Sequence, residues 1–323
     1  MKNVILRTLV SLFFLGWLFY SMRDDIPQII VTLKNIDRKL FIFAVLIFLS
    51  TVLILARRLQ LIFAAEGLTI SLAETCNLTF VGYFFNNFLP SSVGGDIVKA
   101  MCATRITKHP VKSVTSVLMD RILGLFTFII IPSFSVFFLR GVDNPAVPMI
   151  IYSFLVVSIM CFFLIFNRKL ARHLRFIETL LNRFKLGEKV RKIYDGLHNF
   201  KNHKLVVCQA MFLSILGQSV GVLVLYLLAR ALGAHADPIY FFITVPVVHL
   251  ISMAPSLGGL GVREKCYVIF LTPYIGEKHA FALGILWLAL LFFLSLIGGM
   301  IYLFRQDYHI HSRQKATIIG DSL

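Results

Sequence analysis

The sequence predicts an all-α polytopic membrane protein with about six to eight transmembrane helices and two re-entrant or broken-helix motifs in an inverted-repeat-like arrangement. Of the 323 residues, 58% are hydrophobic and 31 are phenylalanine, and the mean hydropathy is +0.83. Such a composition is typical of membrane proteins and excludes a soluble fold. About 20 residues at about 1.5 Å each cross a hydrocarbon core. Apolar runs that span or nearly span occupy residues 4–20, 40–56, 72–90, 113–139, 146–166, 205–232, 238–255 and 280–304. Continuous runs also exclude a β-barrel, whose strands alternate between apolar and polar residues.

The first run is expected to be an uncleaved anchor and not a signal peptide. Lys2 and Arg7 resemble the basic start of a signal sequence, but residues 21–25 contain no small-x-small cleavage site. We therefore expect residues 1–304 to form a single integral membrane domain and residues 305–323 a short polar C-terminal tail.

Residues 167–204 are expected to form basic amphipathic helices on the cytoplasmic side. The segment holds eleven of the 32 lysines and arginines, and its apolar residues recur every three or four positions, both before and after Gly187. One apolar stripe opposite basic residues is typical of helices that lie on an anionic membrane surface. The alternative is a solvated loop that packs on its own bundle. Nucleic acid is not expected as a partner, because basic residues face any bilayer in this way.

We expect no metal site, disulfide framework or cofactor. The five cysteines, at positions 76, 102, 161, 208 and 266, are odd in number and scattered, mostly within apolar segments. The sequence contains no GxxxxGKS/T motif for nucleotide phosphates, so transport would draw on a gradient, a partner or downhill flow.

Two glycine-rich breaks interrupt the apolar runs. They read PSSVGGDIVK at residues 90–99 and PSLGGLGVRE at residues 255–264, and they begin 165 positions apart (255 − 90). Broken helices at matching places in two halves point to the binding site of a membrane transporter. The alternative is that both breaks are ordinary turns.

Charge counts do not decide on which faces the two breaks lie. If both are tips of re-entrant hairpins and the N-terminus is inside, the inside segments hold 22 lysines and arginines and the outside segments 9. Eight full spans with the N-terminus outside also give 22 against 9, so the positive-inside rule does not choose. We favour the hairpins, because the run at residues 72–90 carries a glutamate and three asparagines, which suit a protein-walled cavity better than lipid. The breaks then enter from opposite faces.

Both breaks are expected to bind a phosphate or carboxylate. Paired glycines permit unusual φ angles and close ligand approach, and a helix that begins after such a turn presents free N–H groups and a positive dipole end. Serines add hydroxyl donors. The residues concerned are Ser91, Ser92, Gly94 and Gly95 in the first break and Ser256, Gly258 and Gly259 in the second.

Charged pairs lie directly after both breaks. Asp96 and Lys99 are three positions apart, so on a helix they would share a face and pair with each other or bracket a zwitterionic group. Arg263 and Glu264 supply the same two signs at the second break. The alternative is helix capping and mutual neutralisation without a ligand.

Asp120 and Arg121 lie inside the run at residues 113–139, about 10 Å from its start. Charges at such depth usually face a partner or a wet cavity. We expect Arg121 to contact an anion and Asp120 to partner Lys99, with a structural salt bridge between spans as the alternative. His249 is either a proton shuttle or a satisfied core residue.

Three strings resemble the flippase-like family, which is the membrane region of lysylphosphatidylglycerol synthases together with stand-alone relatives. They are NNFLPSSVGGDIVKA at residues 86–100, DRILGL at residues 120–125 and PSLGGLGVRE at residues 255–264. The resemblance covers nearly the whole chain, although the family more often has arginine where Lys99 stands. The positions that match the family motifs are Asn87, Pro90, Gly94, Gly95, Asp96, Lys99, Asp120, Arg121, Pro255, Gly258, Gly259, Gly261, Arg263 and Glu264.

The resemblance implies a bacterial-type or archaeal-type inner-membrane protein that moves or displays polar lipids. Fused relatives carry a soluble domain that transfers lysine from aminoacyl-tRNA to phosphatidylglycerol. We expect no synthase activity here, since only a polar tail follows residue 304.

The sequence thus predicts a lipid translocase of the cytoplasmic (inner) membrane and not an enzyme. Its expected partners are membrane lipids with anionic or zwitterionic headgroups, and in addition a second copy of the chain or an envelope-lipid enzyme. The rival hypothesis is a membrane-embedded glycosyltransferase that uses a polyprenyl-phosphate lipid, with Asp24 and Asp25 as base or metal ligands. A third is a non-transporting accessory subunit of an envelope-lipid pathway.

Overall fold

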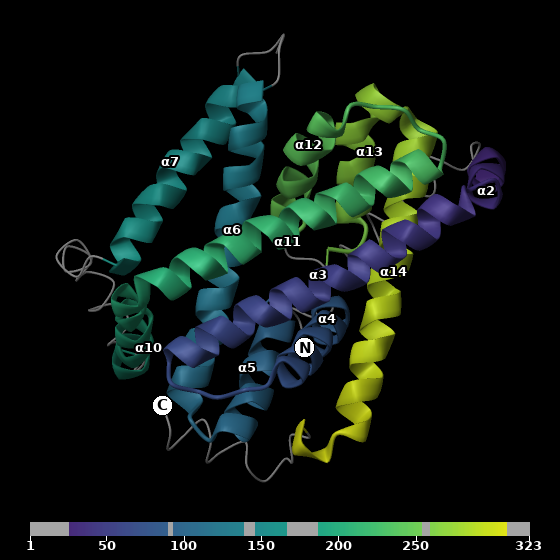
Figure 1. Ribbon diagram of the computed structural model, residues 1–323. Coiled ribbons are helices and arrows are strands. Elements are labelled where there is room, and N and C mark those ends of the chain that lie inside the picture. Colours follow the sequence, from purple (N-terminus) through teal and green to yellow (C-terminus); the bar gives the residue numbers. More distant parts are fainter. Residues whose placement is uncertain (1–25, 90–92, 139–145, 167–186, 254–258, 309–323) are drawn as a thin grey trace.

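The chain folds into a bundle of helices (Figure 1). The structure, a computed structural model, describes residues 26–89, 93–138, 146–166, 187–253 and 259–308, and these ranges contain helices and no strand. The all-α class predicted from the apolar runs is confirmed. In chain order the elements are α2 (Ile26–Lys34), α3 (Arg38–Ala65), α4 (Leu72–Phe88), α5 (Gly94–Thr107), α6 (Pro110–Phe138), α7 (Ala146–Phe166), α10 (Gly187–Asn199), the 3₁₀ turn η1 (Phe200–His203), α11 (Lys204–Ala231), α12 (Pro238–Ile251), α13 (Val262–Ile275), α14 (Glu277–Phe304) and the 3₁₀ turn η2 (Gln306–Tyr308).

Long apolar helices make this a multi-pass membrane protein. Among the described residues, four helical segments are long and apolar enough to cross a bilayer, namely Arg38–Ala65, Pro110–Phe138, Arg191–Ala231 and Glu277–Phe304. They expose large apolar side chains such as Phe43, Phe137 and Phe304. In water such surface would be unfavourable, whereas in a bilayer it contacts lipid tails.

Two stretches of the chain repeat one order of elements, a long helix followed by a two-helix hairpin and a second long helix. The first copy is α3, α4, α5 and α6, and the second is α11, α12, α13 and α14. Corresponding helices begin at nearly constant spacing, for example α3 and α11 (204 − 38 = 166) or α5 and α13 (262 − 94 = 168). The packing follows the repeat as well, because α6 contacts α5 and α12 while α14 contacts α13 and α4.

Helices α3 and α11 form the central pair of the bundle and run antiparallel (Figure 1). At one end the backbone N–H of Asp37, the N-cap of α3, donates to the carbonyl of Ala231, the last residue of α11, at 2.9 Å. Nearer the other end Arg58 Nη1 donates to Ser214 Oγ, also at 2.9 Å. Each copy of the repeat therefore begins where the first helix of the other copy ends.

Both glycine-rich breaks connect the arms of helical hairpins. In the first hairpin the α4 and α5 backbones touch, since a Cβ on Gly95 would lie only 2.2 Å from the carbonyl oxygen of Gly82. In the second, the rings of Tyr240 and Tyr274 stack with centroids 3.9 Å apart. The arms have 17 and 14 residues in one hairpin and 14 in each arm of the other. They reach only about 21–25 Å, less than a hydrocarbon core of about 30 Å.

The two hairpins enter from opposite ends of the central pair. The first follows the C-terminal end of α3, where Lys112 Nζ of α6 donates to the carbonyl of Glu66 at 2.9 Å and closes the hairpin base. The second follows the C-terminal end of α11. Because α3 and α11 are antiparallel, these bases lie at opposite ends of the bundle. The predicted inverted arrangement is confirmed, and the alternative with eight full spans and both breaks on one face is wrong.

Helix α10, the longest described part of the predicted basic amphipathic segment, packs on the bundle. It contacts α6, where a Cβ on Gly196 would lie 2.5 Å from Thr115 Cγ2. Leu197 packs against a buried cluster that contains Met119 and Phe200. Residues 167–186 lie outside the described ranges, so contact of this segment with a membrane surface stays a prediction.

The segment after α14 is tied to the base of the first hairpin. Arg305 Nη1 donates to Glu74 Oε2 at 2.5 Å, and the Tyr308 hydroxyl donates to the other oxygen of the same carboxylate. The Tyr308 side chain is completely buried. The beginning of the polar tail is therefore held against α4, while residues 309–323 lie outside the described ranges.

Candidate functional site

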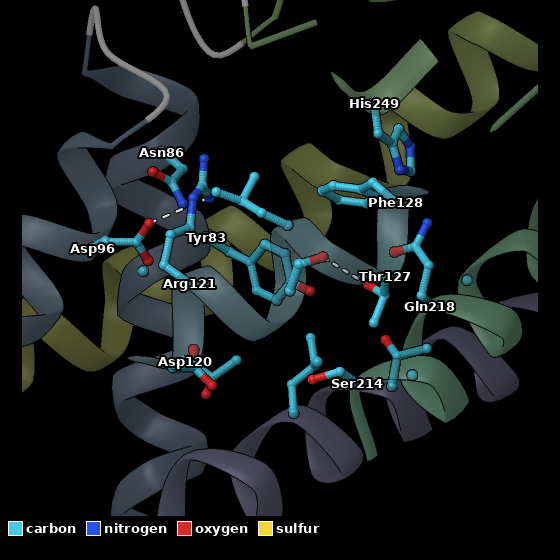
Figure 2. A pocket seen from close by; sticks show the side chains of 18 of the residues that line it. Tyr83, Asn86, Asp96, Asp120, Arg121, Thr127, Phe128, Ser214, Gln218 and His249 are labelled. Atoms are coloured by element: carbon cyan, nitrogen blue, oxygen red, sulfur yellow. Dashed lines mark hydrogen bonds and ion pairs between the residues drawn. The ribbon is translucent and has the colours of Figure 1, made fainter. Parts of the chain in front are cut away.

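A cavity of about 330 Å³ lies where the two hairpins approach each other, and every helix of the two repeats contributes to its lining. The first hairpin supplies Asn86, Asn87, Asp96 and Lys99, and the second supplies Arg263. Figure 2 shows Asp96 and Arg121 pointing toward each other across one side of the cavity. Residues from both predicted breaks, 165 positions apart in sequence, thus surround one space.

A ladder of alternating charges, which we call the ion ladder, crosses the cavity wall through α6, α5, α6 and α3. Arg121 Nη1 lies 3.3 Å from Asp96 Oδ2. Lys99 Nζ lies 3.4 Å from Asp96 Oδ1 and 3.7 Å from Asp120 Oδ2. Arg58 Nε donates to Asp120 Oδ1 at 2.7 Å. The expected pairing of Asp120 with Lys99 is therefore present, and Arg121 faces the cavity beside Asp96.

The ion ladder is buried, which makes its pairing obligatory. Arg58, Asp96, Lys99 and Asp120 are each less than 10% exposed, while the Arg121 side chain is 25% exposed. A buried charge without a partner is strongly unfavourable. Arg121 is thus the member of the ladder that a ligand in the cavity reaches most readily.

The glycines of the first break serve close packing and not unusual φ angles. Both lie in the first turn of α5, and neither is among the described glycines with positive φ. Asn86 Oδ1 accepts the backbone N–H of Gly95 at 2.9 Å. The Gly95 N–H is therefore not free, because the preceding helix already caps this donor.

Asn87 fixes the tip of the first hairpin to the other copy of the repeat. Its Nδ2 donates to the carbonyl of Leu291 at 3.2 Å and to Ser295 Oγ at 2.5 Å, both on α14. Asn87 also lines the cavity. These two hydrogen bonds give Asn87 a structural role, which is to anchor the cavity wall to α14.

The second break is organised by left-handed glycines and a buried carboxylate. Gly259 and Gly261 have φ of +84° and +79°, a region that favours glycine. Glu264 Oε2 accepts the N–H of Gly261 at 2.7 Å, and Oε1 accepts from Arg263 Nη2 at 2.9 Å. Glu264 therefore caps α13 and neutralises Arg263, as the capping alternative predicted. Only Arg263 of this pair lines the cavity.

Some predicted site residues cannot be placed. Ser91, Ser92, Ser256 and Gly258 lie outside the described ranges, so their part in a site stays a prediction.

Opposite the ion ladder the cavity has an aromatic and amide-lined side. His249 Nε2 lies 3.0 Å from the Tyr267 hydroxyl, and its ring stacks on Trp287 and meets Phe128 edge to face. His249 is thus hydrogen-bonded within the protein. Figure 2 places Gln218 on this side, next to Thr127 and Phe128.

Sequence reasoning missed Arg58, Ser214 and Gln218 as cavity residues. The apolar run ends at residue 56, which places Arg58 in a loop, whereas α3 continues to Ala65. The adjacent arginines Arg57 and Arg58 were an available signal, because two neighbours on one helix point to different faces and cannot both face the same side. In the structure Arg57 is exposed and Arg58 is buried. Gln209 and Gln218 are the two glutamines of the apolar run at residues 205–232, and polar side chains inside a membrane span often mark a binding site, but the sequence does not tell which of the two faces a cavity.

These features define a class, namely a polytopic membrane protein whose two inverted repeats enclose a charged central cavity. The chain belongs to the family described as the lysylphosphatidylglycerol synthase TM region, whose family model matches residues 4–299. The resemblance carried by the three sequence strings is thereby confirmed. No curated protein and no solved structure matches the chain significantly.

Proposed function

We propose that this protein is a lipid translocase of the cytoplasmic membrane that moves a polar headgroup through the central cavity while the lipid tails stay in the bilayer. The observation that carries the proposal is the ion ladder at the point where two hairpins from opposite ends meet. Inverted repeats with broken helices around a central site are typical of alternating-access transporters. Membership of the family supports a lipid-related role.

The cavity suits a headgroup. Its volume of about 330 Å³ is at the small end of the range for small-molecule sites, too small for a complete two-chain lipid. The outer surface of the spanning helices is apolar and exposed, so tails can remain in lipid beside the bundle.

Lys99 is the buried basic residue that an incoming anion can most readily draw away from its carboxylate partners. Its two contacts, at 3.4 and 3.7 Å, are longer than the 2.7 Å hydrogen bond between Arg58 and Asp120, and short charge-assisted bonds are the stronger ones. A phosphate that enters beside Arg121 therefore gains Lys99 as a second cation, while the Arg58–Asp120 pair stays closed.

Alternating access follows from the hairpin geometry in this proposal. Each hairpin base lies at one end of the bundle and each tip borders the cavity. A small rocking of one repeat against the other would open the cavity past one hairpin and close it past the other. The long helices α6 and α14 each contact both hairpins, which couples the two movements.

Reconstitution in liposomes tests this proposal. The purified protein is incorporated into vesicles with headgroup-labelled lipids, and the appearance of label on the opposite leaflet is measured with and without an imposed gradient. We expect movement above protein-free vesicles, a strong loss in Arg121→Gln, and near-normal movement in the control Arg230→Gln, whose guanidinium contacts Tyr226 at the end of α11.

Movement equal to that of protein-free vesicles under every gradient would overturn the translocase proposal. Transfer of a sugar from a polyprenyl-phosphate donor by the same preparation would instead establish the glycosyltransferase. Oligomerisation and association with an envelope-lipid enzyme are further proposals, tested by the mass of the detergent-solubilised protein and by co-purification.

A further inference from the structure

We infer that the cavity selects a monoanionic phosphodiester headgroup whose remaining part is uncharged and bears hydroxyl groups, and that it discriminates against aminoacylated and zwitterionic headgroups. This inference rests on the proposed function and adds the class of lipid that the cavity takes. It follows from the balance of the charges, from one unpaired amide and from the open space beside it.

The carboxylates at the cavity already have basic neighbours, although Asp96 Oδ2 is buried without a hydrogen bond. Asp120 accepts from Arg58 and faces Lys99, and Asp96 lies between Lys99 and Arg121. A lysyl or ethanolamine ammonium would therefore have to compete with Arg58, Lys99 or Arg121 to reach an acid. Of the described residues that line the cavity, none offers an acid without such a basic neighbour.

The basic side chains exceed the acids by one. The described lining contains four basic residues (Arg58, Lys99, Arg121 and Arg263) and two acids, and Glu264 neutralises Arg263 from outside the lining. These seven side chains together carry a net charge of +1 (4 − 3). A single negative charge, such as that of a phosphodiester, balances the site, because buried charges require compensation.

Gln218 sets the chemistry of the opposite side. Its Nε2 is buried and has no hydrogen-bond partner among the described residues, although the residue lines the cavity and faces the aromatic side in Figure 2. An amide N–H needs an acceptor, and a buried donor without one is costly. A hydroxyl or ether oxygen provides that acceptor, whereas an ammonium group has only donors.

Space for such a group lies one turn along α11. Gly221 follows Gln218 by three residues and so shares its face, and it lines the same cavity. A Cβ on Gly221 would meet no atom within 4 Å. The rings of Phe128, His249 and Trp287 border this side, and aromatic faces pack well against the C–H groups of a polyol.

Binding of short-chain lipids in detergent tests this inference without any transport step. The probes are dihexanoyl forms of phosphatidylglycerol, phosphatidylmethanol, phosphatidylethanolamine, phosphatidylcholine and lysyl-phosphatidylglycerol, and the readout is the rise in Tm as a function of probe concentration. We expect phosphatidylglycerol to bind about fivefold more tightly than phosphatidylmethanol, the ratio for about 1 kcal/mol from one net hydrogen bond. The other three probes bind more weakly than both.

Two variants test the two sides of the site separately, namely the amide of Gln218 that would bind the hydroxyl group and the guanidinium of Arg121 that would bind the phosphate. Gln218→Leu should abolish the advantage of phosphatidylglycerol over phosphatidylmethanol and leave the affinity for phosphatidylmethanol unchanged. Arg121→Gln should weaken both. The control Gln209→Leu changes an exposed glutamine of the same helix outside the cavity lining and should keep the wild-type order of affinities.

Equal or tighter binding of phosphatidylethanolamine, phosphatidylcholine or lysyl-phosphatidylglycerol would overturn the inference. So would an unchanged preference for phosphatidylglycerol in Gln218→Leu. The two proposals can fail separately. If the probes bind in the expected order but no lipid moves in liposomes, the translocase proposal is wrong and the inferred headgroup class stands. If an aminoacylated lipid moves in liposomes and the protein shows no selectivity for hydroxylated probes, the inferred headgroup class is wrong and the translocase proposal stands.

Discussion

Arg58 and Asp120, 62 positions apart in sequence, are joined by a 2.7 Å hydrogen bond between Nε and Oδ1 in the wall of the cavity. Both side chains are more than 90% buried. The bond connects α3 with α6, and Arg58 also donates to Ser214 on α11. One ion pair therefore ties three helices of the two repeats together.

Removal of one partner from this pair should cost more stability than removal of both. Asp120→Leu leaves Arg58 buried without its carboxylate, and we expect a loss of about 3–5 kcal/mol. The double variant Arg58→Met with Asp120→Leu should recover a large part of that loss, because no unpaired charge remains. Thermal unfolding in detergent of the wild type, both single variants and the double variant measures the coupling. Strictly additive losses would contradict this account.

Gly95 and Gly221 should respond oppositely to alanine. Gly95→Ala places a Cβ 2.2 Å from the Gly82 carbonyl oxygen, so the first hairpin has to separate, at a cost of about 1–3 kcal/mol or more. Gly221→Ala meets nothing within 4 Å, and it replaces a helical glycine at a gain of up to about 1 kcal/mol. The measurement is the Tm of each variant. A Gly95→Ala protein as stable as the wild type would show that α4 and α5 are not packed this closely.

A larger side chain at Gly221 should block the cavity without unfolding the protein. Gly221→Leu fills open space beside Gln218, so headgroup movement in liposomes is expected to fall strongly while Tm stays near that of the wild type. Leu223→Phe, at a partly exposed position of the same helix, serves as the matched control and should leave transport unchanged. Full transport by Gly221→Leu would mean that the headgroup takes another route.

Glu66, directly after α3, should make stability depend on pH. Burial raises the pKa of its carboxyl above the ordinary value of 4.5, opposed by Asn199, Lys112 and His203. The folded protein therefore binds the proton more tightly than the unfolded chain. The stabilisation that this tighter proton binding gives to the folded state is complete below about pH 4.5, and it is lost as the pH rises through the raised pKa of Glu66. Glu66→Gln should remove this pH dependence. The Tm of the variant should exceed that of the wild type at a pH above the raised pKa of Glu66, but not at a pH below 4.5. An identical pH profile for the two proteins would contradict the burial argument.

The opposite entry of the hairpins predicts opposite labelling of their bases. Thr69 precedes α4 and His235 precedes α12, and both side chains are exposed. In a background without the five native cysteines, Thr69→Cys and His235→Cys should react with a membrane-impermeant maleimide from different sides of sealed vesicles. Labelling of both from one side would require the eight-span topology.

The apolar pattern by itself determined the class, the approximate positions of the long helices and the positions of the two breaks. These are local properties, because about 20 consecutive apolar residues have few alternatives to a helix in lipid. The run predicted at residues 146–166 coincides with α7, and the start predicted at residue 238 coincides with that of α12. The charge spacing also placed Asp96 and Lys99 on one face.

Only the tertiary structure decided the sidedness of the breaks and the composition of the cavity. The positive-inside rule gave equal counts for both topologies, and the antiparallel contact of α3 with α11 resolves them. Arg58, Gln218 and Ser214 join the site because helices more than 60 positions apart pack together, which no local pattern encodes. The same packing separates Arg263, which faces the cavity, from Glu264, which caps a helix, although the two are neighbours in the sequence.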